Sequence, residues 1–274
     1  MASPVMDWPQ PLVRQPRVAV SGAALAPGER VLAEETAVAL AYDGATHAVM
    51  MASPTDLEDF ALGFSLSEGV VASAEAIEEM EILSRGELGL EVRMRLAEAV
   101  GERHLRRRRA MAGPVGCGLC GLDSLKEAMR AVEPVRSPLR IWPGAVTAAM
   151  EALDAAQSLN RDARAVHATA FWRPGDGLVA IREDVGRHNA LDKLAGALAR
   201  AGVEGGSGVV ALTSRVSVEM VQKAARLGAP VIAAISAPTA LAVRTAESCG
   251  VTLVAIARGG RFEVFTGHAR VIGS

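Results

Sequence analysis

The chain has 274 residues, half of them hydrophobic, which suits one large domain or two modest ones whose core needs no metal or disulfide framework. Its 29 basic and 31 acidic residues leave a net charge of −2, so no overall positive field attracts nucleic acid. No apolar run approaches the roughly 20 residues that cross a bilayer, and the N-terminus lacks a secretory pattern. Together with only three cysteines, this composition predicts a cytoplasmic protein without a membrane or nucleic-acid partner.

Strand patterns dominate the first hundred residues. Residues 31–42 and 45–51 predict a hairpin, because the Asp43-Gly44 pair between them tolerates the positive φ of a short turn. A helix is expected over 55–68, where Pro54 precedes the first turn and apolar residues recur at helical spacing. Two further strands are predicted at 77–83 and 88–96. A loose lead-in is suggested by Trp8, Pro9, Pro11 and Pro16.

Strands and helices alternate through the C-terminal half, and their apolar strands are continuous. Such repeated units indicate a mostly parallel sheet covered by helices on both faces. The predicted fold class is therefore α/β, with a smaller N-terminal α+β domain over 15–112 and a three-layer α/β/α domain over 113–274. The expected helices are 143–159, 187–200, 218–227 and 238–248, with one more after the capping-box pattern at 124–127. The expected strands are 166–172, 178–182, 209–212, 231–235, 251–256 and 262–265.

The strongest chemical signal is a pair of thiols, Cys117 and Cys120, within a stretch that holds four glycines between residues 113 and 121. Such a stretch bends sharply and lets a bulky partner approach its backbone. A run of arginines at 103–109 and the start of the helix expected near Ser124 would both favour the reactive thiolate. The arrangement indicates an exposed, nucleophilic dithiol. The arginine run itself is either a solvated helix face or a patch for phosphate or an acidic partner.

Three other interpretations of the thiols stay open on the residues alone. Structural zinc needs two more ligands, and neither Cys249 nor the five scattered histidines form a second pair at ligand spacing, so no structural metal is expected. As a special case of zinc, the deaminase signature fails, because no glutamate stands two residues after His167 and the cysteines precede it. Thioredoxin-like exchange would place the motif early in a small βαβ domain. In the third interpretation the two cysteines have no chemical function and pack as small, semi-buried hydrophobic side chains.

Polar and basic residues follow several of the C-terminal strands, where open α/β sheets bind ligands. Hydroxyls, glycines, helix N-termini and arginines together suit a phosphate or pyrophosphate, which predicts an anionic, nucleotide-like ligand. No P-loop pattern occurs, and no dinucleotide fingerprint follows a suitable strand. His188 is a candidate general base or ligand donor. The other candidates from this reasoning are Ser214, Arg215, Arg258, Gly259, Gly260 and Arg261.

With these residues assembled, the chain resembles the formate dehydrogenase accessory sulfurtransferase family (FdhD/NarQ). The resemblance spans about residues 30–265, and its most specific stretch runs from Glu183 to Lys193. It implies an N-terminal domain followed by one that resembles cytidine deaminase without its zinc, and a homodimer. The stretches that carry it are 50–54, 61–64, 67–69, 116–121, 183–193, 219–224 and 236–242.

The resemblance also implies a function. Members of the family take persulfide sulfur from a cysteine desulfurase and pass it to the bis-molybdopterin guanine dinucleotide form of the molybdenum cofactor, before that cofactor enters formate dehydrogenase. By motif position Cys117 matches the persulfide-bearing cysteine, and Cys120 is its partner with a role left open. Two alternatives are a cofactor chaperone without sulfur chemistry and a dithiol oxidoreductase. The family's cofactor-binding stretch falls on Ile256, Ala257, Arg258, Gly259, Gly260 and Arg261, of which the first two depart from the aromatic residue and cysteine of some relatives.

Overall fold

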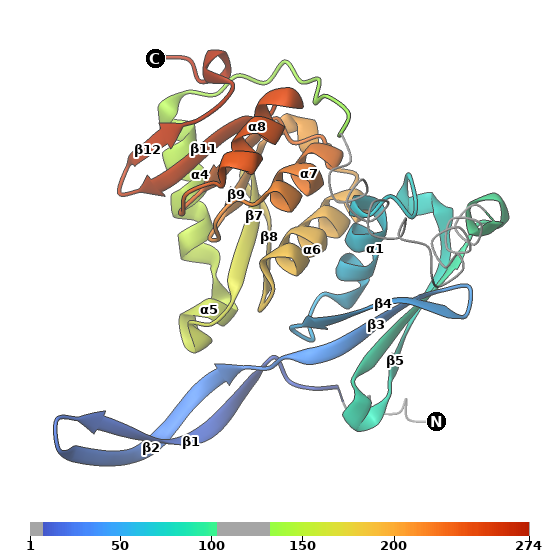
Figure 1. The fold of residues 1–274 in the computed structure, drawn as a ribbon, viewed down its shortest axis with the longest axis vertical. Coiled ribbons are helices and arrows are strands. Elements are labelled where there is room, and N and C mark those ends of the chain that lie inside the picture. The colour runs from blue at the N-terminus through green and yellow to red at the C-terminus, as the bar shows by residue number, and fades with distance from the viewer. Residues whose placement is uncertain (1–7, 103–131, 274) are drawn as a thin grey trace, which may run out of the picture.

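The computed structural model describes residues 8–102 and 132–273 (Figure 1). The dithiol Cys117 and Cys120, the arginine run and the helix expected after Ser124 lie outside the described residues. The predicted domain boundary at 112/113 lies there too, so the division into domains stays a prediction. Among the described residues, no helix is long and apolar enough to cross a membrane.

A two-stranded arm projects from the body at the N-terminal end (Figure 1). Strands β1 (Leu12–Ser21) and β2 (Ala24–Ala33) pair antiparallel along their full length. The loose lead-in expected from the prolines is wrong after residue 11, because Pro16 lies within β1, opposite Glu29. A two-stranded ribbon consists of edges, so a proline is tolerated where its missing N–H would face outward.

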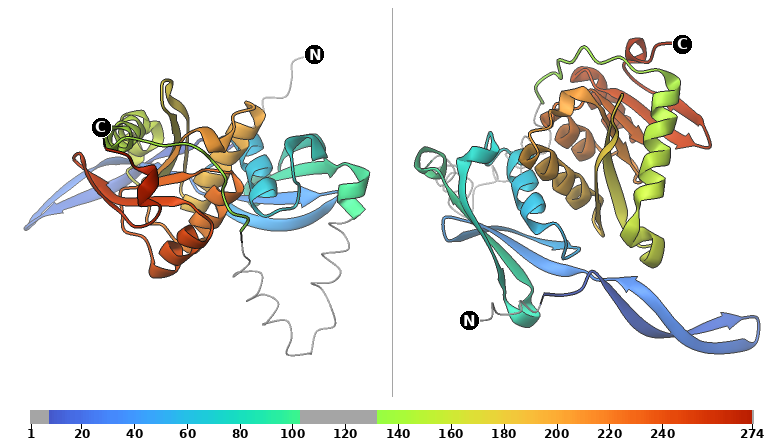
Figure 2. Two further views of the ribbon diagram at one scale, coloured as in Figure 1. Left: turned by 90° about the horizontal axis from the view of Figure 1, so that it is seen from above. Right: turned by 180° about the vertical axis from the view of Figure 1, so that it is seen from behind.

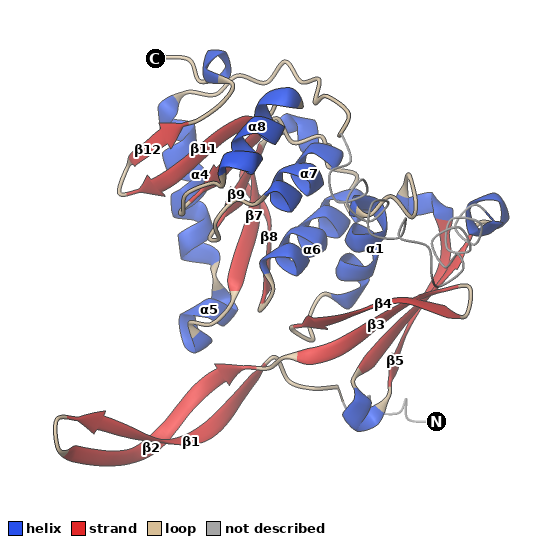
Figure 3. Ribbon diagram, in the orientation of Figure 1, coloured by secondary structure: helices blue, strands red, loops and turns tan. Residues whose placement is uncertain are grey.

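The N-terminal sheet has the strand order β4-β3-β6-β5, and the helix α1 packs against it (Figure 3). The expected hairpin between β3 and β4 is confirmed, with positive φ at both Asp43 and Gly44. Phe60 and Phe64 of the helix α1 are buried against the sheet, and together with Tyr42 they form the centre of this core. The bounds are β3 (Thr36–Tyr42), β4 (Ala45–Ala52), α1 (Leu57–Ser67), β5 (Ile77–Ser84) and β6 (Leu90–Leu96).

The C-terminal sheet has six strands in the order β12-β11-β10-β9-β7-β8. Only β9, β10 and β11 pair in parallel, so the mostly parallel sheet expected from the sequence is wrong. The reason is local: β7 and β8 are joined by a tight turn with positive φ at Gly175 and Gly177, which forces them antiparallel. The bounds are β7 (His167–Arg173), β8 (Gly177–Asp184), β9 (Val209–Leu212), β10 (Val231–Ala234), β11 (Thr252–Arg258) and β12 (Arg261–Val264).

Helices cover both faces of this sheet, as the α/β/α prediction requires (Figure 2). Successive residues of β9 point to opposite sides: Val210 and Leu212 pack with α6, α7 and α8, whereas Val209 and Ala211 pack with α4. The strands are consequently buried on both faces, which explains their continuous apolar sequence. The bounds are α4 (Pro143–Ala156), α5 (Ser158–Ala163), α6 (Arg187–Arg200), α7 (Val218–Arg226) and α8 (Ala240–Ser248).

Helices α1 and α6 join the two sheets at an unusually close crossing (Figures 1 and 2). A Cβ added at Gly63 of α1 would lie 1.7 Å from the carbonyl oxygen of Asp192, and one added at Gly196 of α6 would lie 1.9 Å from that of Asp59. Only glycine permits this approach of backbone to backbone. The two sheets and their shared helices therefore form one packed body.

Candidate functional site

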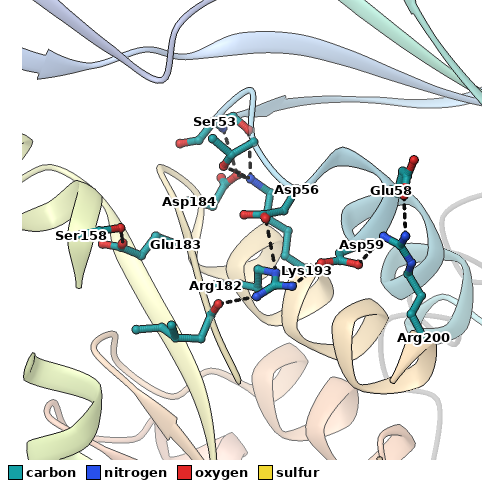
Figure 4. Close-up of polar contacts among 12 residues, drawn as sticks. Ser53, Asp56, Glu58, Asp59, Ser158, Arg182, Glu183, Asp184, Lys193 and Arg200 are labelled. Carbon is teal, nitrogen blue, oxygen red and sulfur yellow. Dashed lines mark hydrogen bonds and ion pairs between the residues drawn. The ribbon is translucent and has the colours of Figure 1, made fainter. Parts of the chain in front are cut away.

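The motif with the most specific resemblance, residues 183–193, holds the two sheets together. Lys193 Nζ lies 2.7 Å from Asp184 Oδ2, and both side chains are fully buried (Figure 4). The ammonium also donates to the carbonyl oxygen of Ser53 at 2.9 Å, while the amide of Ser53 donates to Asp184 at 2.9 Å. Asn189 donates to Asp184 and to the carbonyl oxygen of Met51. This pair ties the end of β4 to the start of α6.

A second group of charges joins α1 to β8 and α6. Asp59 accepts two hydrogen bonds from Arg182, at 2.8 and 2.6 Å, and one from Arg200 at 2.9 Å (Figure 4). Asp59 is buried, so these charge-assisted bonds replace the water it loses. The acid in the first turn of α1 thus anchors the helix across the junction.

Lys223 of α7 completes the junction. Its ammonium contacts both carboxylate oxygens of Asp192, at 2.9 and 3.0 Å, and also the side chains of Ser67 and Glu68. Burial pushes the pKa of Lys223 down, but Asp192 and Glu68 outweigh it and raise this pKa, so the lysine stays charged. A buried cation with several acceptors is a structural group here.

Glu183, which precedes Asp184 at the end of β8, also has a structural role. Its carboxylate accepts from the backbone amides of Leu159 and Asn160, both at 2.8 Å, and from the Ser158 hydroxyl at 3.0 Å. Those amides belong to the first turn of α5, whose free N–H groups need acceptors. Of the acidic and amide side chains in the 183–193 motif, Glu183, Asp184, Asn189 and Asp192 all serve packing and orientation.

Arg187 and His188 are the first residues of α6, and each has a buried side-chain nitrogen without a hydrogen bond among the described residues. These nitrogens are Arg187 Nε and His188 Nε2, and the latter lies 3.8 Å from Glu219 Oε2. Burial lowers the pKa of His188, and the positive charge of Arg187 lowers it further. At neutral pH the imidazole is therefore uncharged, which suits the predicted role of base or ligand donor.

Ser214 and Arg215 follow β9 at the same edge of the sheet. Ser214 is buried and its hydroxyl donates to the carbonyl oxygen of Arg215 at 3.0 Å, while the Arg215 side chain is exposed. His188 follows β8, which is four strand spacings, roughly 19 Å, from β11. The structure places the predicted residues along one edge and does not gather them in one cavity.

A pocket of about 340 Å³ lies at the other end of this edge, between α4 and the ends of β10 and β11. Five of the six residues in the predicted cofactor-binding stretch line it, namely Ala257, Arg258, Gly259, Gly260 and Arg261. Nothing lies within 4 Å of a Cβ built at Gly259 or Gly260, so a ligand can approach this backbone closely. The remaining lining residues are Val146, Thr147, Met150, Glu151, Asp154, Ile235 and Phe262.

Ile256, the first residue of that stretch, has a left-handed backbone with φ of 53°. A β-branched residue is an outlier there, and the strain is of order 1–3 kcal/mol. The pairing of β11 with β12 is irregular between Ala255 and Arg258, so the strain coincides with a bulge beside the pocket. Bulges of this kind commonly redirect a strand next to a binding site.

Sequence reasoning missed the contribution of α4 to this pocket. Thr147, Glu151 and Asp154 recur at helical spacing, but such spacing on a surface helix indicates only a solvated face. The third cysteine, Cys249, is buried in the core beside α8, where burial raises the pKa of its thiol. No cluster of potential metal ligands occurs among the described residues.

The fold and pocket define an α/β protein with two helix-covered sheets and a charged cavity at the carboxyl ends of the larger one. A profile of the FdhD/NarQ family matches residues 33–272, so the chain belongs to this family. The sulfur carrier protein FdhD of Agrobacterium fabrum is 53% identical over 260 residues, which cover 94% of this chain and 96% of that protein. The protein of the same name from Cupriavidus necator is 51% identical over 247 residues, covering 90% and 85%.

A solved structure supports the same relationship. A protein from Desulfotalea psychrophila, described as a formate dehydrogenase accessory protein, superposes with a TM-score of 0.77 and 25% sequence identity. The superposition covers 95% of this chain and 99% of that one. The predicted α/β fold and the resemblance to the family are thereby confirmed, while the likeness to cytidine deaminase stays a prediction.

Proposed function

We propose that this chain is a sulfur carrier that serves formate dehydrogenase. The observation that carries this proposal is membership of the FdhD/NarQ family. The relative from Agrobacterium fabrum is named sulfur carrier protein and matches this chain over nearly its full length. Cys117 and Cys120 supply the required thiols in a glycine-rich stretch of the sequence. The homodimer and the cytoplasmic location expected from the sequence stay predictions.

In the proposed first step, a cysteine desulfurase delivers sulfur to Cys117. The Cys117 thiolate attacks the terminal sulfur of the desulfurase persulfide, a new S–S bond forms, and the old S–S bond breaks with its electron pair leaving on the desulfurase thiolate. Cys117 then carries the persulfide, and no external oxidant or reductant is needed. The reactive form is the thiolate, so the step slows when the thiol is protonated.

In the second step, the carried sulfur passes to the bis-molybdopterin guanine dinucleotide cofactor, bound as substrate. Attack of the Cys120 thiolate on the inner sulfur of Cys117 would release the outer sulfur as hydrosulfide and leave a Cys117–Cys120 disulfide. The two thiols then supply the two electrons that reduce the sulfur, and a cellular thiol regenerates them. A persulfide shared between both cysteines is the alternative role of Cys120.

The pocket supports the cofactor half of this proposal. Arg258 and Arg261 offer guanidinium groups to phosphate oxygens, and Gly259 and Gly260 leave their backbone accessible between them. Both arginines are exposed, whereas Ala257 behind them is buried, so the positive charges stand at the rim of the cavity. A nucleotide bound here would present its phosphates to these arginines.

Sulfur loading is tested by incubating the protein with a cysteine desulfurase and cysteine, followed by mass spectrometry of the peptide that carries Cys117. One added sulfur atom is expected on wild type and on Cys249→Ala, the matched control, because Cys249 is buried in the core. Cys117→Ala is expected to take up none. Full loading of Cys117→Ala overturns the assignment of this residue.

Formate dehydrogenase activity in cells separates the carrier from the chaperone alternative. Cys117→Ala and Arg258→Ala should both abolish activity if sulfur is delivered to a bound cofactor. A chaperone without sulfur chemistry requires Arg258 but not Cys117. A dithiol oxidoreductase requires Cys117 but not Arg258, and it turns over disulfide substrates.

A further inference from the structure

The pocket is lined by acidic as well as basic side chains. Glu151 and Asp154 lie three residues apart on α4, so their side chains are neighbours on one face of the helix. Arg258 and Arg261 line the same pocket from the end of β11 and the start of β12. A cavity that accepts only an anion has no need of two carboxylates.

These four charges do not neutralise one another. Within the part of the chain that the structure describes, no ion pair joins either acid to either arginine. Arg258 donates through Nε to the carbonyl oxygen of Ile235 at 3.3 Å, and Asp154 Oδ1 accepts from Gln157 Nε2 at 3.3 Å. Glu151 has no such contact among the described residues, so both of its carboxylate oxygens are available to a ligand.

A carboxylate with two uncommitted oxygens binds best to two adjacent donors. The Watson–Crick edge of guanine offers such a pair, the ring N1–H and the exocyclic N2–H₂ group. Adenine offers its N6–H₂ group beside the lone pair of N1, and that lone pair repels a carboxylate. An arginine rim for phosphate together with an acidic lining therefore favours a guanine nucleotide over an adenine nucleotide.

We propose that Glu151 selects guanine in this pocket by accepting hydrogen bonds from N1–H and N2–H₂ of the base. The proposal rests on the proposed function, because it takes the guanine nucleotide end of the cofactor as the ligand. Met150, Ile235 and Phe262 supply apolar surface for the faces of the base. At about 340 Å³ the cavity is at the small end of ligand pockets, which suits one nucleoside with its phosphates at the rim.

The test is calorimetric titration of the full-length protein with GDP, IDP and ADP. Wild type is expected to bind GDP at least about tenfold more tightly than ADP, and IDP, which lacks the 2-amino group, between the two. Glu151→Gln is expected to reduce the ratio of GDP to ADP affinity by about tenfold, because its amide presents a donor where the carboxylate accepted. Asp162→Asn on α5 removes an equal charge outside the pocket and is the matched control.

The outcomes separate this inference from the function on which it rests. If wild type binds GDP but Glu151→Gln keeps the full preference over ADP, the role of Glu151 is wrong and the nucleotide pocket stands. If Asp154→Asn loses the preference and Glu151→Gln retains it, the assignment to Glu151 is equally overturned. If wild type binds none of the three nucleotides, the inference and the proposed cofactor pocket both fail, whereas sulfur loading of Cys117 is unaffected.

Discussion

Lys193 and Asp184 form a fully buried ion pair that holds the end of β8 and the helix α6 against the loop after β4. Breaking such a pair leaves an uncompensated charge in the interior, which costs about 3–5 kcal/mol. Lys193→Met is therefore expected to lower the free energy of unfolding by that amount. Urea denaturation measures it, with the change in midpoint at constant m as the readout.

The control for this prediction is an ion pair on the surface that also joins a basic side chain to an aspartate. Arg173 pairs with Asp176 in the turn between β7 and β8, where both side chains are substantially exposed. Arg173→Gln is expected to change stability by less than about 1 kcal/mol. Equal losses of unfolding free energy in the two variants would show that the buried pair contributes no more to stability than the exposed pair does.

The close crossing of α1 and α6 predicts that Gly→Ala substitutions there lower stability, although such substitutions usually raise it. In an ordinary helix interior, Gly→Ala stabilises by about 1 kcal/mol. Gly63→Ala and Gly196→Ala should instead destabilise by several kcal/mol, because each new Cβ would overlap a backbone carbonyl and force α1 away from α6. Thermal denaturation checks this, and Gly206→Ala is the control, since nothing lies closer than 3.7 Å to its Cβ. A rise in melting temperature for Gly63→Ala would contradict the close crossing.

Local signals explain which elements could be predicted from the sequence. Helix α6 occupies the residues expected for it, 187–200, because Leu191, Leu194 and Leu198 recur at helical spacing. The Asp43-Gly44 turn and strand β9 follow equally from nearby residues. In these cases the interactions that decide the structure lie within a few positions.

The rest depends on contacts between distant parts of the chain. Asp184 and Ser53 are 131 residues apart, so no local pattern distinguishes a buried junction from a ligand edge in the 183–193 motif. The turn after β7 implies that β7 and β8 run antiparallel. The position of β7 between β8 and β9, however, is determined by tertiary contacts. The acids of α4 likewise acquire a role only because β11 ends beside them.

The strained backbone at Ile256 predicts a stabilising substitution. Glycine adopts the left-handed conformation without steric cost, so Ile256→Gly should raise the free energy of unfolding by about 1 kcal/mol, after the entropy that glycine loses on folding. The control is Ile272→Gly, because Ile272 is exposed to a similar extent, 43% against 41%, without a positive φ. That control should be destabilised. A matching loss in Ile256→Gly would show that the side chain contributes more than the strain removes.

The two histidines near Arg187 predict how stability depends on pH. Burial lowers the pKa of His188 and of His167, and the charge of Arg187 lowers both further. Glu219 and Glu68 oppose the shift at His188 and Lys223 adds to it, while Asp184 opposes the shift at His167. A folded state that binds protons less readily than the unfolded chain is favoured above the unfolded pKa of about 6.5. Stability is therefore expected to fall as the pH drops from about 6.5 toward the lower folded values.

Arg187→Gln tests the cause of this dependence. Removing its charge should raise the pKa of both imidazoles, which NMR titration of the histidine ring protons reports directly. The loss of unfolding free energy between about pH 8 and pH 5 should become smaller in this variant, because the folded and unfolded pKa values lie closer together. Arg173→Gln removes a charge from the opposite end of β7 and should leave both titrations unchanged. If the two variants shift the pKa values of the histidines equally, the effect reflects net charge and not the nearby charge of Arg187.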